Sequence, residues 1–350
     1  MGLLFPYDSV DLSSDNSLLV ILDQTQLPAK EVFLQLNEES EIFDAIYTLK
    51  VRGAPAIGIA AAYGLCVIMK REKTLNINDF KLRALEVISR LNLSRPTAVN
   101  LSWALKRMEL KLLSVSETSG STTYEILESL FDEANAIKAE DVEMCRSISE
   151  YGLTLLKPGM GVLTHCNAGH LAVSRLGTAL GPLYLAKEAG YDIRVFVDET
   201  RPLLQGSRLT AFELMKSGID VTLICDNMAY SVMDRKWVDL VLVGCDRIAK
   251  NGDVANKIGT AGLAILAKNK GIPFYVLGPS SSIDSTCMSG DDIIIEERPS
   301  DEVTDLMFKS SVAPKGVKVY NPAFDITRAE NVTGIITEKG IYKYPFNFFY

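Results

Sequence analysis

Histidine and tryptophan are scarce in this sequence, and closely paired cysteines are missing. The 350 residues include two histidines and two tryptophans, and the six cysteines are scattered without CxxC spacing. A structural zinc site needs clustered cysteine and histidine ligands, so we expect no metal site. Most of the thiols are expected to stay reduced, as they do in a cytosol.

Concentrated positive charge and long apolar runs are also absent. The net charge is −8, and the chain has no block of about five or more lysines and arginines. Nucleic acids are bound by concentrated basic surfaces, so they are poor candidate partners. The first residues lack the pattern of a secretion signal, and no stretch approaches about 18 uninterrupted apolar residues. We therefore expect no membrane segment and a cytoplasmic location.

Two common nucleotide-binding signatures are missing as well. Neither a GxGxxG motif nor a Walker A motif follows the first strand of the second half of the chain. The sequence therefore gives no support for a dinucleotide cofactor or a P-loop nucleotide, and we expect no cofactor.

Helical patterns dominate the first 140 residues. Ile42, Ala45, Ile46 and Leu49 recur at the spacing of one helix face, and residues 59–69 are apolar on nearly all sides, as in a buried helix. Further helices are predicted over 78–92, 101–113 and 123–157, and a strand or hairpin ends in residues 18–22. At this length about two domains are expected, and we predict a mostly helical N-terminal domain over residues 1–145.

Strands alternate with helices in the second half. Short apolar runs occur at residues 162–164, 193–197, 221–224, 238–243 and 274–277, with helical segments between them. This alternation is typical of an α/β fold with a parallel, doubly wound sheet, which we assign to a C-terminal domain over residues 146–350.

Polar or reactive residues follow each of these predicted strands. Such sheets bind ligands outside the carboxyl ends of their strands, so these residues are expected to share one site. In chain order they are His165-Cys166-Asn167, Asp198-Glu199-Thr200-Arg201, Asp226-Asn227, Asp246-Arg247 and Gly278-Pro279-Ser280.

The stretch from Val243 to Thr260 combines a carboxylate with an expected anion site. Asp246 is predicted at the end of a strand, and a helical run follows from Ile258 to Lys268. Asn256 and Lys257 are expected at the start of that helix, where free backbone N–H groups favour an anion. The pattern indicates a small phosphorylated metabolite as ligand.

Each candidate residue also has a purely structural interpretation. Cys166 is expected at a helix N-terminus, where the dipole favours the thiolate, although a lone cysteine is more often an inert buried residue. Asp246 is a candidate catalytic acid or base, or a helix cap. Gln205 is a candidate for binding a sugar hydroxyl, or it caps the helix over residues 209–216. His165 and His170 are weaker candidates, for which a packed structural role is expected.

The segment Arg52-Gly53-Ala54-Pro55 carries a similar pair of interpretations. Gly53 allows the backbone to turn or to approach a ligand, and Pro55 suits the first turn of a helix. Arg52 is then either a guanidinium clamp on a phosphate or a surface arginine beside a helix-capping turn.

Together these segments resemble the family that contains the S-methyl-5-thioribose-1-phosphate isomerases and the regulatory subunits of translation initiation factor 2B. The resemblance covers most of the chain in order. It rests on VRGAPAIGIAAAYG (51–64), SRPTAVNL (94–101), THCNAG (164–169), DETRPLLQGSRLTAFEL (198–214), ICDNMA (224–229), VGCDRIAKNGDVANKIGT (243–260), PFYVLGPSSSID (273–284) and NPAFDIT (321–327).

The resemblance implies a helical N-terminal domain, a Rossmann-like C-terminal domain, and a homodimer. It also implies isomerisation of a furanose 1-phosphate to a ribulose 1-phosphate in methionine salvage, without cofactor or metal. Cys166 and Asp246 match the family's catalytic positions. The positions that hold the sugar phosphate are matched by Arg52, Gly53, Ala54, Arg95, Gln205, Asn256 and Lys257.

Two departures from the common family pattern leave the substrate open. Ala168 stands where many members have threonine, and Gly259-Thr260-Ala261-Gly262 stands where many carry an aromatic residue. These changes leave a 5-deoxyribose 1-phosphate isomerase as an alternative. A ribose 1,5-bisphosphate isomerase also stays open, and so does a non-catalytic regulatory subunit, although such a subunit would have no reason to keep Cys166 and Asp246 together.

Overall fold

The computed structural model describes residues 7–96 and 98–348. Its internal contacts divide the chain into two compact units. The first unit runs to Glu143 and includes the separate short segment His170–Arg175; the second contains Met144–Gly169 and the chain from Leu176 onward. The single domain boundary after residue 145 stays a prediction.

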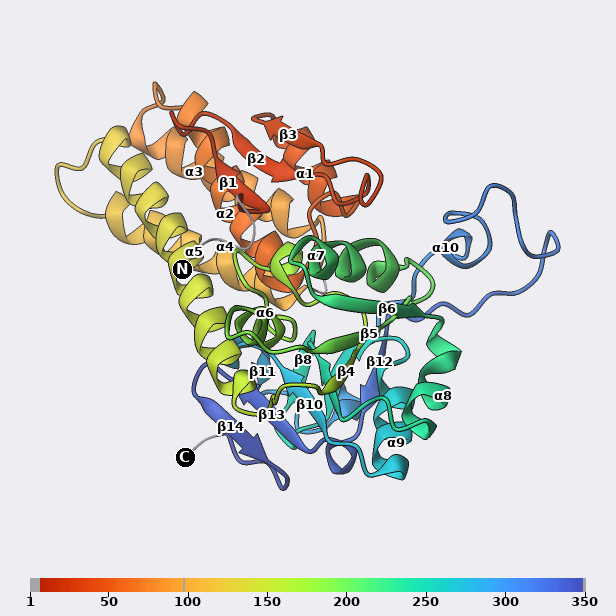
Figure 1. Cartoon of the computed structure of the whole chain (residues 1–350). Helices are drawn as coiled ribbons and strands as arrows, with labels where there is room; N and C mark the ends of the chain where they lie inside the picture. Colours follow the sequence, from red (N-terminus) through yellow and green to blue (C-terminus); the bar gives the residue numbers. More distant parts are fainter. Residues whose placement is uncertain (1–6, 97, 349–350) are drawn as a thin grey trace. The chain divides into compact units, whose positions relative to one another are not determined.

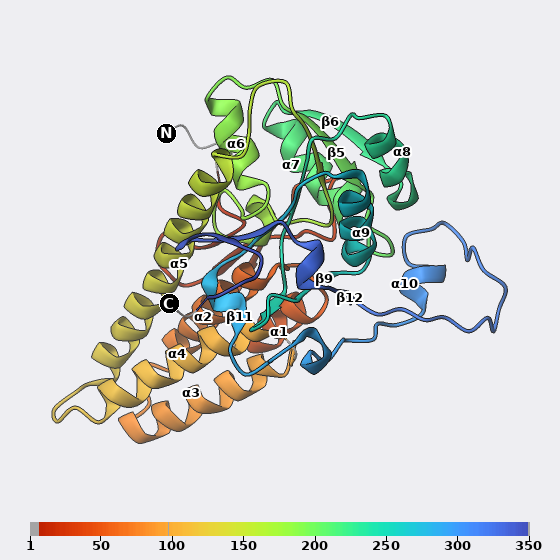
Figure 2. The same cartoon turned by 90° about the horizontal axis from the view of Figure 1, so that it is seen from below.

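The first unit joins a three-stranded antiparallel sheet to a group of helices (Figure 1). Helices α3 and α4 lie side by side in Figure 2, and each contacts α2. The helices begin and end within a few residues of the predicted positions. The elements are β1 Val10–Leu12, β2 Leu19–Leu22, β3 Phe33–Leu36, α1 Glu39–Tyr47, α2 Ala54–Arg71, α3 Ile77–Asn92, α4 Val99–Ser116 and α5 Thr123–Leu153, whose last turns belong to the second unit.

Helix α2 forms the core of the first unit. Every residue from Ala56 to Met69 is buried, and the helix contacts α1, α3, α4, β1 and β2. Among the described residues it is also the one helix long and apolar enough to cross a membrane, and 78% of it is buried inside the protein. Its apolar surface on all sides is explained by burial among these neighbours.

The second unit is built on a seven-stranded sheet in the order β14-β13-β10-β7-β4-β5-β6. All neighbouring strands are parallel except the last hairpin, β13–β14. Its strands are β4 Gly161–Thr164, β5 Arg194–Asp198, β6 Asp220–Ile224, β7 Leu240–Val243, β10 Phe274–Leu277, β13 Gly334–Thr337 and β14 Gly340–Lys343. The five apolar runs predicted as strands are all present, and the predicted α/β fold is confirmed.

Helices cover both faces of this sheet. The chain moves from β4 to β6 in one direction and from β7 to β13 in the other, so right-handed crossovers place α6 and α7 opposite α8 and α9. Figure 1 shows α7 and α9 on opposite sides of the strands. The helices are α6 Gly181–Glu188, α7 Ala211–Lys216, α8 Ala229–Asp234, α9 Thr260–Lys270 and α10 Asp301–Thr304, with short turns η1 His170–Ala172 (in the first unit), η2 Gly206–Thr210, η3 Asp226–Met228, η4 Ser280–Ser282, η5 Gly290–Asp292 and η6 Ala329–Asn331.

A second, four-stranded sheet was not predicted. It has the order β11-β8-β9-β12, with β8 Arg247–Ala249, β9 Val254–Lys257, β11 Ile283–Asp284 and β12 Phe324–Thr327. The signal for the β8–β9 hairpin was present, because Asn251-Gly252 separates two short apolar runs. The prediction that Asn256 and Lys257 begin a helix is therefore wrong: both lie at the end of β9, and α9 begins at Thr260.

Candidate active site

Cys166 and Asp246 follow the two strands between which the order of the main sheet reverses. β4 and β7 are neighbours, paired through Val162 with Leu240 and Leu163 with Val241. From β4 the chain continues to β5 and β6 on one side, and from β7 it continues to β10 and β13 on the other. Ligands of doubly wound sheets bind at such a switch point, outside the carboxyl ends of the strands.

The loops after these two strands pack directly against each other. A Cβ atom added to Gly244 would lie 2.7 Å from the Cβ of Ala168. Gly244 precedes Asp246 by two residues, and Ala168 follows Cys166 by two residues. The missing side chain of Gly244 permits this close approach. The two predicted catalytic residues, Cys166 and Asp246, therefore lie on adjoining loops.

Cys166 does not lie at a helix N-terminus, so that prediction is wrong. After β4 the chain forms an irregular loop, and the next α-helix, α6, begins at Gly181. Cys166 instead has a positive φ of 62°. A non-glycine residue in this region costs about 1–3 kcal/mol and persists where its surroundings fix it, often at functional sites.

Two threonine hydroxyls hold the Cys166 backbone. Its N–H donates to Oγ1 of Thr200 at 2.8 Å, and its carbonyl oxygen accepts from Oγ1 of Thr210 at 2.5 Å. Both threonines are fully buried. No pattern in the sequence singles out Thr210, and Thr200 stands out only as one of the strand-end residues.

His165 has the structural role that its sequence context suggested. Its Nδ1 lies 2.9 Å from Oδ2 of Asp198, and its Nε2 lies 2.9 Å from the carbonyl oxygen of Ile258. Burial lowers the pKa of His165, but the hydrogen bond and charge of Asp198 outweigh this effect and raise it. Because Ile258 directly follows Lys257, this ring ties the Cys166 loop to the end of β9.

Asp246 lies between β7 and β8, so it is not a helix cap. It is half-buried, and its N–H donates to the carbonyl oxygen of Ala255 at 3.0 Å. This bond fixes the backbone of Asp246 against the residue that precedes Asn256.

Asn256 and Lys257 are held in place by neighbouring groups. Nδ2 of Asn256 donates to Oγ1 of Thr260 at 3.1 Å. Nζ of Lys257 donates to the carbonyl oxygen of Ala323 at 3.0 Å and lies 4.6 Å from the ring centroid of Phe324. An amide and an ammonium group, both preorganised, therefore adjoin the Asp246 loop.

The N–H groups at the start of α9 are not open to an anion. Asp325 accepts from the N–H of Gly259 at 2.8 Å and from that of Ala261 at 3.0 Å. Burial raises the pKa of Asp325, while these two N–H groups act against that shift. The expectation of a free anion cradle at this helix is therefore wrong, since a carboxylate from β12 occupies it.

Gln205 is buried, with 6% of its surface exposed. It directly precedes η2, but its side chain accepts no capping hydrogen bond from an N–H group of this turn, so the capping interpretation is wrong. Within the described part of the chain, its Oε1 has no hydrogen-bond partner. Buried polar atoms of this kind are rare without a partner, and a ligand hydroxyl is one way to supply it.

The other predicted phosphate-binding residues belong to the first unit. Gly53 has a φ of 96°, and a Cβ atom there would lie 2.4 Å from the Cα of Ala172, a residue of the same unit. Ala54 begins α2, and the half-buried Arg52 precedes this turn. Arg95 is half-buried in the turn after α3.

One cluster among the described residues has the composition of a metal site. Ligand atoms of His165, Asp198 and Asp226 all lie within 4.8 Å of one another. Hydrogen bonds to the protein already engage both ring nitrogens of His165, and both oxygens of Asp226 accept from the N–H groups of Thr200 and Arg201. His165, Asp198 and Asp226 therefore take part in hydrogen bonds that stabilise the loop of Cys166.

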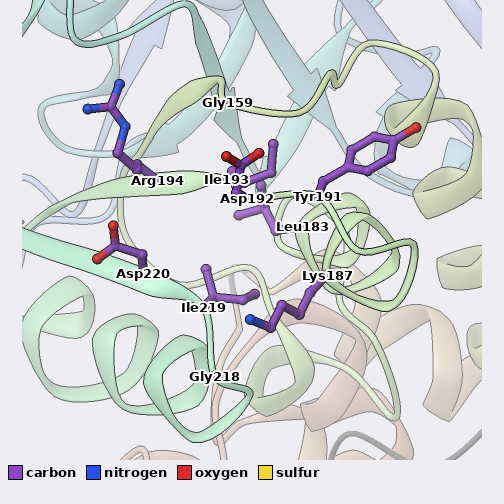
Figure 3. Close-up of a pocket in the computed structure, with 10 residues that line it drawn as sticks. All are labelled: Gly159, Leu183, Lys187, Tyr191, Asp192, Ile193, Arg194, Gly218, Ile219 and Asp220. Atoms are coloured by element: carbon purple, nitrogen blue, oxygen red, sulfur yellow. The ribbon is translucent and has the colours of Figure 1, made fainter.

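A cavity of about 510 Å³ lies near the amino ends of strands in the main sheet, at the end opposite to Cys166 and Asp246 (Figure 3). Its lining includes Gly159, which precedes β4, together with Arg194 and Asp220, the first residues of β5 and β6. These positions are at the amino ends of the strands, so this cavity is distinct from the candidate site.

Comparison with known proteins gives close relatives along nearly the whole chain. A Parabacteroides distasonis protein named methylthioribose-1-phosphate isomerase is 60% identical over 328 residues, covering 93% of this chain and 96% of the relative. A Petrotoga mobilis protein named 5-deoxyribose 1-phosphate isomerase is 56% identical over 337 residues, covering 96% of each.

Solved structures show the same similarity. The crystal structure of 5-methylthioribose 1-phosphate isomerase from Pyrococcus horikoshii superposes with a TM-score of 0.91 at 41% identity, covering 98% of this chain and 94% of that one. A structure from A. fulgidus, described as subunit delta of translation initiation factor eIF-2B, gives 0.87 at 43% identity, covering 97% and 96%. Residues 50–344 match the Initiation factor 2 subunit family, to which this chain belongs.

Proposed function

We propose that this protein is a sugar-phosphate isomerase that converts S-methyl-5-thio-α-D-ribose 1-phosphate to S-methyl-5-thio-D-ribulose 1-phosphate in the cytoplasm. The observation that carries the proposal is the placement of Cys166 and Asp246 on adjoining loops at the switch point of the sheet. Relatives of 60% and 41% identity bear the name of this activity.

The reaction transfers a hydrogen from C2 to C1. It therefore requires a proton acceptor at C2 and a proton donor at C1. Phosphate blocks the anomeric carbon, so the furanose ring must open with the phosphate still attached. The C2–H bond then breaks and a C1–H bond forms, while the C2 hydroxyl becomes the ketone. C1 is reduced as C2 is oxidised, so the step is internally balanced and needs no external oxidant.

Each proposed residue has a role in this sequence. Asp246 exchanges the proton at the ring oxygen or the C2 hydroxyl, and Cys166 transfers a proton at carbon. Gln205 binds a sugar hydroxyl through its buried amide. Asn256 and Lys257 bind the phosphate and stabilise developing negative charge.

The resemblance to the family also proposes Arg52, Gly53, Ala54 and Arg95 as phosphate-binding positions. Arg52 and Arg95 supply guanidinium groups that match phosphate geometry. At Gly53 and Ala54 the backbone turns into α2, which has Pro55 in its first turn. The backbone N–H groups at the start of a helix lack partners within the helix and can donate to an anion.

A 5-deoxyribose 1-phosphate isomerase is the alternative, because a relative with that name is 56% identical. The two substrates differ at C5 and share the same chemistry. A non-catalytic regulatory role is less well supported, because such a subunit has no use for a thiol and a carboxylate at the switch point.

The test is a direct assay of the purified protein with three substrates. Methylthioribose 1-phosphate, 5-deoxyribose 1-phosphate and ribose 1,5-bisphosphate are incubated separately, with and without EDTA, and ketose formation is measured. We expect the highest kcat/KM with the first substrate and no effect of EDTA. No turnover of any substrate would refute the isomerase, and a loss of activity with EDTA would refute a metal-independent mechanism.

Two substitutions test the assigned chemistry. Cys166→Ser and Asp246→Asn should each lower kcat by about 10²- to 10⁴-fold, because each removes a proton-transfer group while keeping its size. Circular dichroism and substrate binding by calorimetry should stay close to those of the wild type. A fully active Asp246→Asn variant would exclude this mechanism.

A further inference from the structure

The backbone of Cys166 is held on both sides by side chains that have no assigned role. Its φ of 62° is unfavourable for a residue with a side chain, and its N–H and C=O are bonded to the hydroxyls of Thr200 and Thr210. We infer that Thr200 and Thr210 are positioning residues, which fix the strained turn that presents the Cys166 thiol to the substrate. The inference rests on the proposed function of Cys166.

Contacts with residues other than Cys166 hold Thr200 in place. It also has a positive φ, of 64°, and its hydroxyl donates to the carbonyl oxygen of Asp198 at 3.0 Å. The carboxylate of Asp226 accepts from the N–H of Thr200 and from that of Arg201, both at 2.7 Å. The Thr200 hydroxyl therefore has one orientation, with its lone pair directed at the Cys166 N–H.

Thr210 is positioned by an irregular turn of helix. Residues 206–210 form a π-helical turn before α7, and such turns change the direction in which the last side chains point. Nδ2 of Asn167 donates to Oγ1 of Thr210 at 3.1 Å and also to Glu213 on α7. The Thr210 hydroxyl thus accepts from the residue after Cys166 and donates to Cys166 itself.

The two hydroxyls bond to the backbone of Cys166, and through that backbone they set the direction of its thiol. A reactive side chain on a strained turn after a strand is presented at the end of the sheet, and its direction depends on the backbone angles of that one residue. Proton transfer falls steeply when the reacting group is displaced by about 1 Å. Loss of either hydroxyl is therefore expected to slow the chemical step more than it weakens substrate binding.

The experiment compares hydroxyl-free and hydroxyl-retaining variants at each position. Thr200→Val and Thr210→Val keep the branched shape and remove the hydroxyl, whereas Thr200→Ser and Thr210→Ser keep the hydroxyl. Thr337→Val is the matched control, because Thr337 is equally buried in the same unit and its hydroxyl also bonds to a backbone N–H, that of Lys339. Each protein is tested for kcat, KM and the iodoacetamide alkylation rate of the Cys166 peptide by mass spectrometry.

We expect each valine variant to lose about 10- to 100-fold in kcat, with KM within about twofold and slower alkylation of Cys166. The serine variants should restore both rates, and the control should behave as the wild type. The inference would be overturned if the valine variants had the same kcat and the same alkylation rate of Cys166 as the wild type. Serine variants as impaired as the valine variants would also overturn it, since the methyl group and not the hydroxyl would then matter.

Alkylation separates this inference from the proposed function. If the wild type turns over no sugar phosphate, the proposed function fails, but the alkylation rates still report how Cys166 is presented. Equal alkylation in the wild type and both valine variants would then refute the positioning role on its own evidence.

Discussion

At the residue scale, Gln205 combines deep burial with a carbonyl oxygen that, among the described residues, has no hydrogen-bond partner. An unmet acceptor of this kind destabilises the folded protein without ligand, and a substrate hydroxyl would satisfy it. Stability in the free protein is therefore lower than it would be with an apolar residue of similar size at this position.

Gln205→Leu should separate these two effects. We expect the melting temperature of the free protein to rise or stay unchanged, because the unmet acceptor is removed. KM for the sugar phosphate should increase by roughly tenfold, since the hydroxyl of the substrate loses its partner. Thermal scans with and without substrate, together with initial-rate kinetics, provide both values, and an unchanged KM would show that Gln205 does not bind the substrate.

At the element scale, Asp253 joins the unpredicted β8–β9 hairpin to two other segments. Its side chain is almost fully buried and accepts from the N–H groups of Gly290 and Ala329, and from Arg328 at 3.0 Å. Burial raises the pKa of Asp253, but these donors more than offset that effect and hold it below its usual value of 3.8.

This lowered pKa predicts how stability depends on pH. The folded protein holds the carboxylate ionised more strongly than the unfolded chain does, so its contribution is complete above about pH 4 and is lost as the pH falls through the folded-state pKa. Asp253→Asn should reduce the free energy of unfolding by about 1–3 kcal/mol at pH 7 and by progressively less below about pH 4. Urea denaturation at several pH values measures both numbers.

Asp291 offers the matched control. It forms an ion pair with the same arginine, Arg328, at 2.6 Å, but its side chain is 73% exposed. Exposed ion pairs contribute little, so Asp291→Asn should change the free energy of unfolding by less than about 1 kcal/mol. Equal effects of the two substitutions would mean that Asp253 acts only through Arg328.

Elements with a strong local pattern were predictable, and contacts between distant residues were not. The apolar runs of β4, β5, β6, β7 and β10 indicate buried strands, and they indicate which residues follow each strand. The conformation of Cys166 depends on hydroxyls 34 and 44 residues away, and the start of α9 is capped by a carboxylate 66 residues from Gly259. No periodicity in the sequence reports such pairs, so the helix expected after Cys166 was wrong.

At the scale of the whole molecule, the resemblance to this family leads us to expect a homodimer. Light scattering coupled to size-exclusion chromatography should give a mass twice the 38.4 kDa of one chain. The same elution mass over roughly a hundredfold range of protein concentration would indicate a stable dimer. A mass of 38.4 kDa at micromolar concentration would contradict the expectation.

The chain passes between its two units three times: within α5, after Gly169, and again after Arg175. The segment His170–Arg175 belongs to the first unit. In it the carbonyl oxygen of Leu171 accepts from Nε2 of Gln24, and Ala172 packs closely against Gly53. A gene fragment ending near Glu143 would encode a first unit with a missing piece, and the remaining fragment would carry that piece without its surroundings. Recombination at a single point therefore cannot exchange one unit intact, and an engineered exchange must change the chain at more than one point.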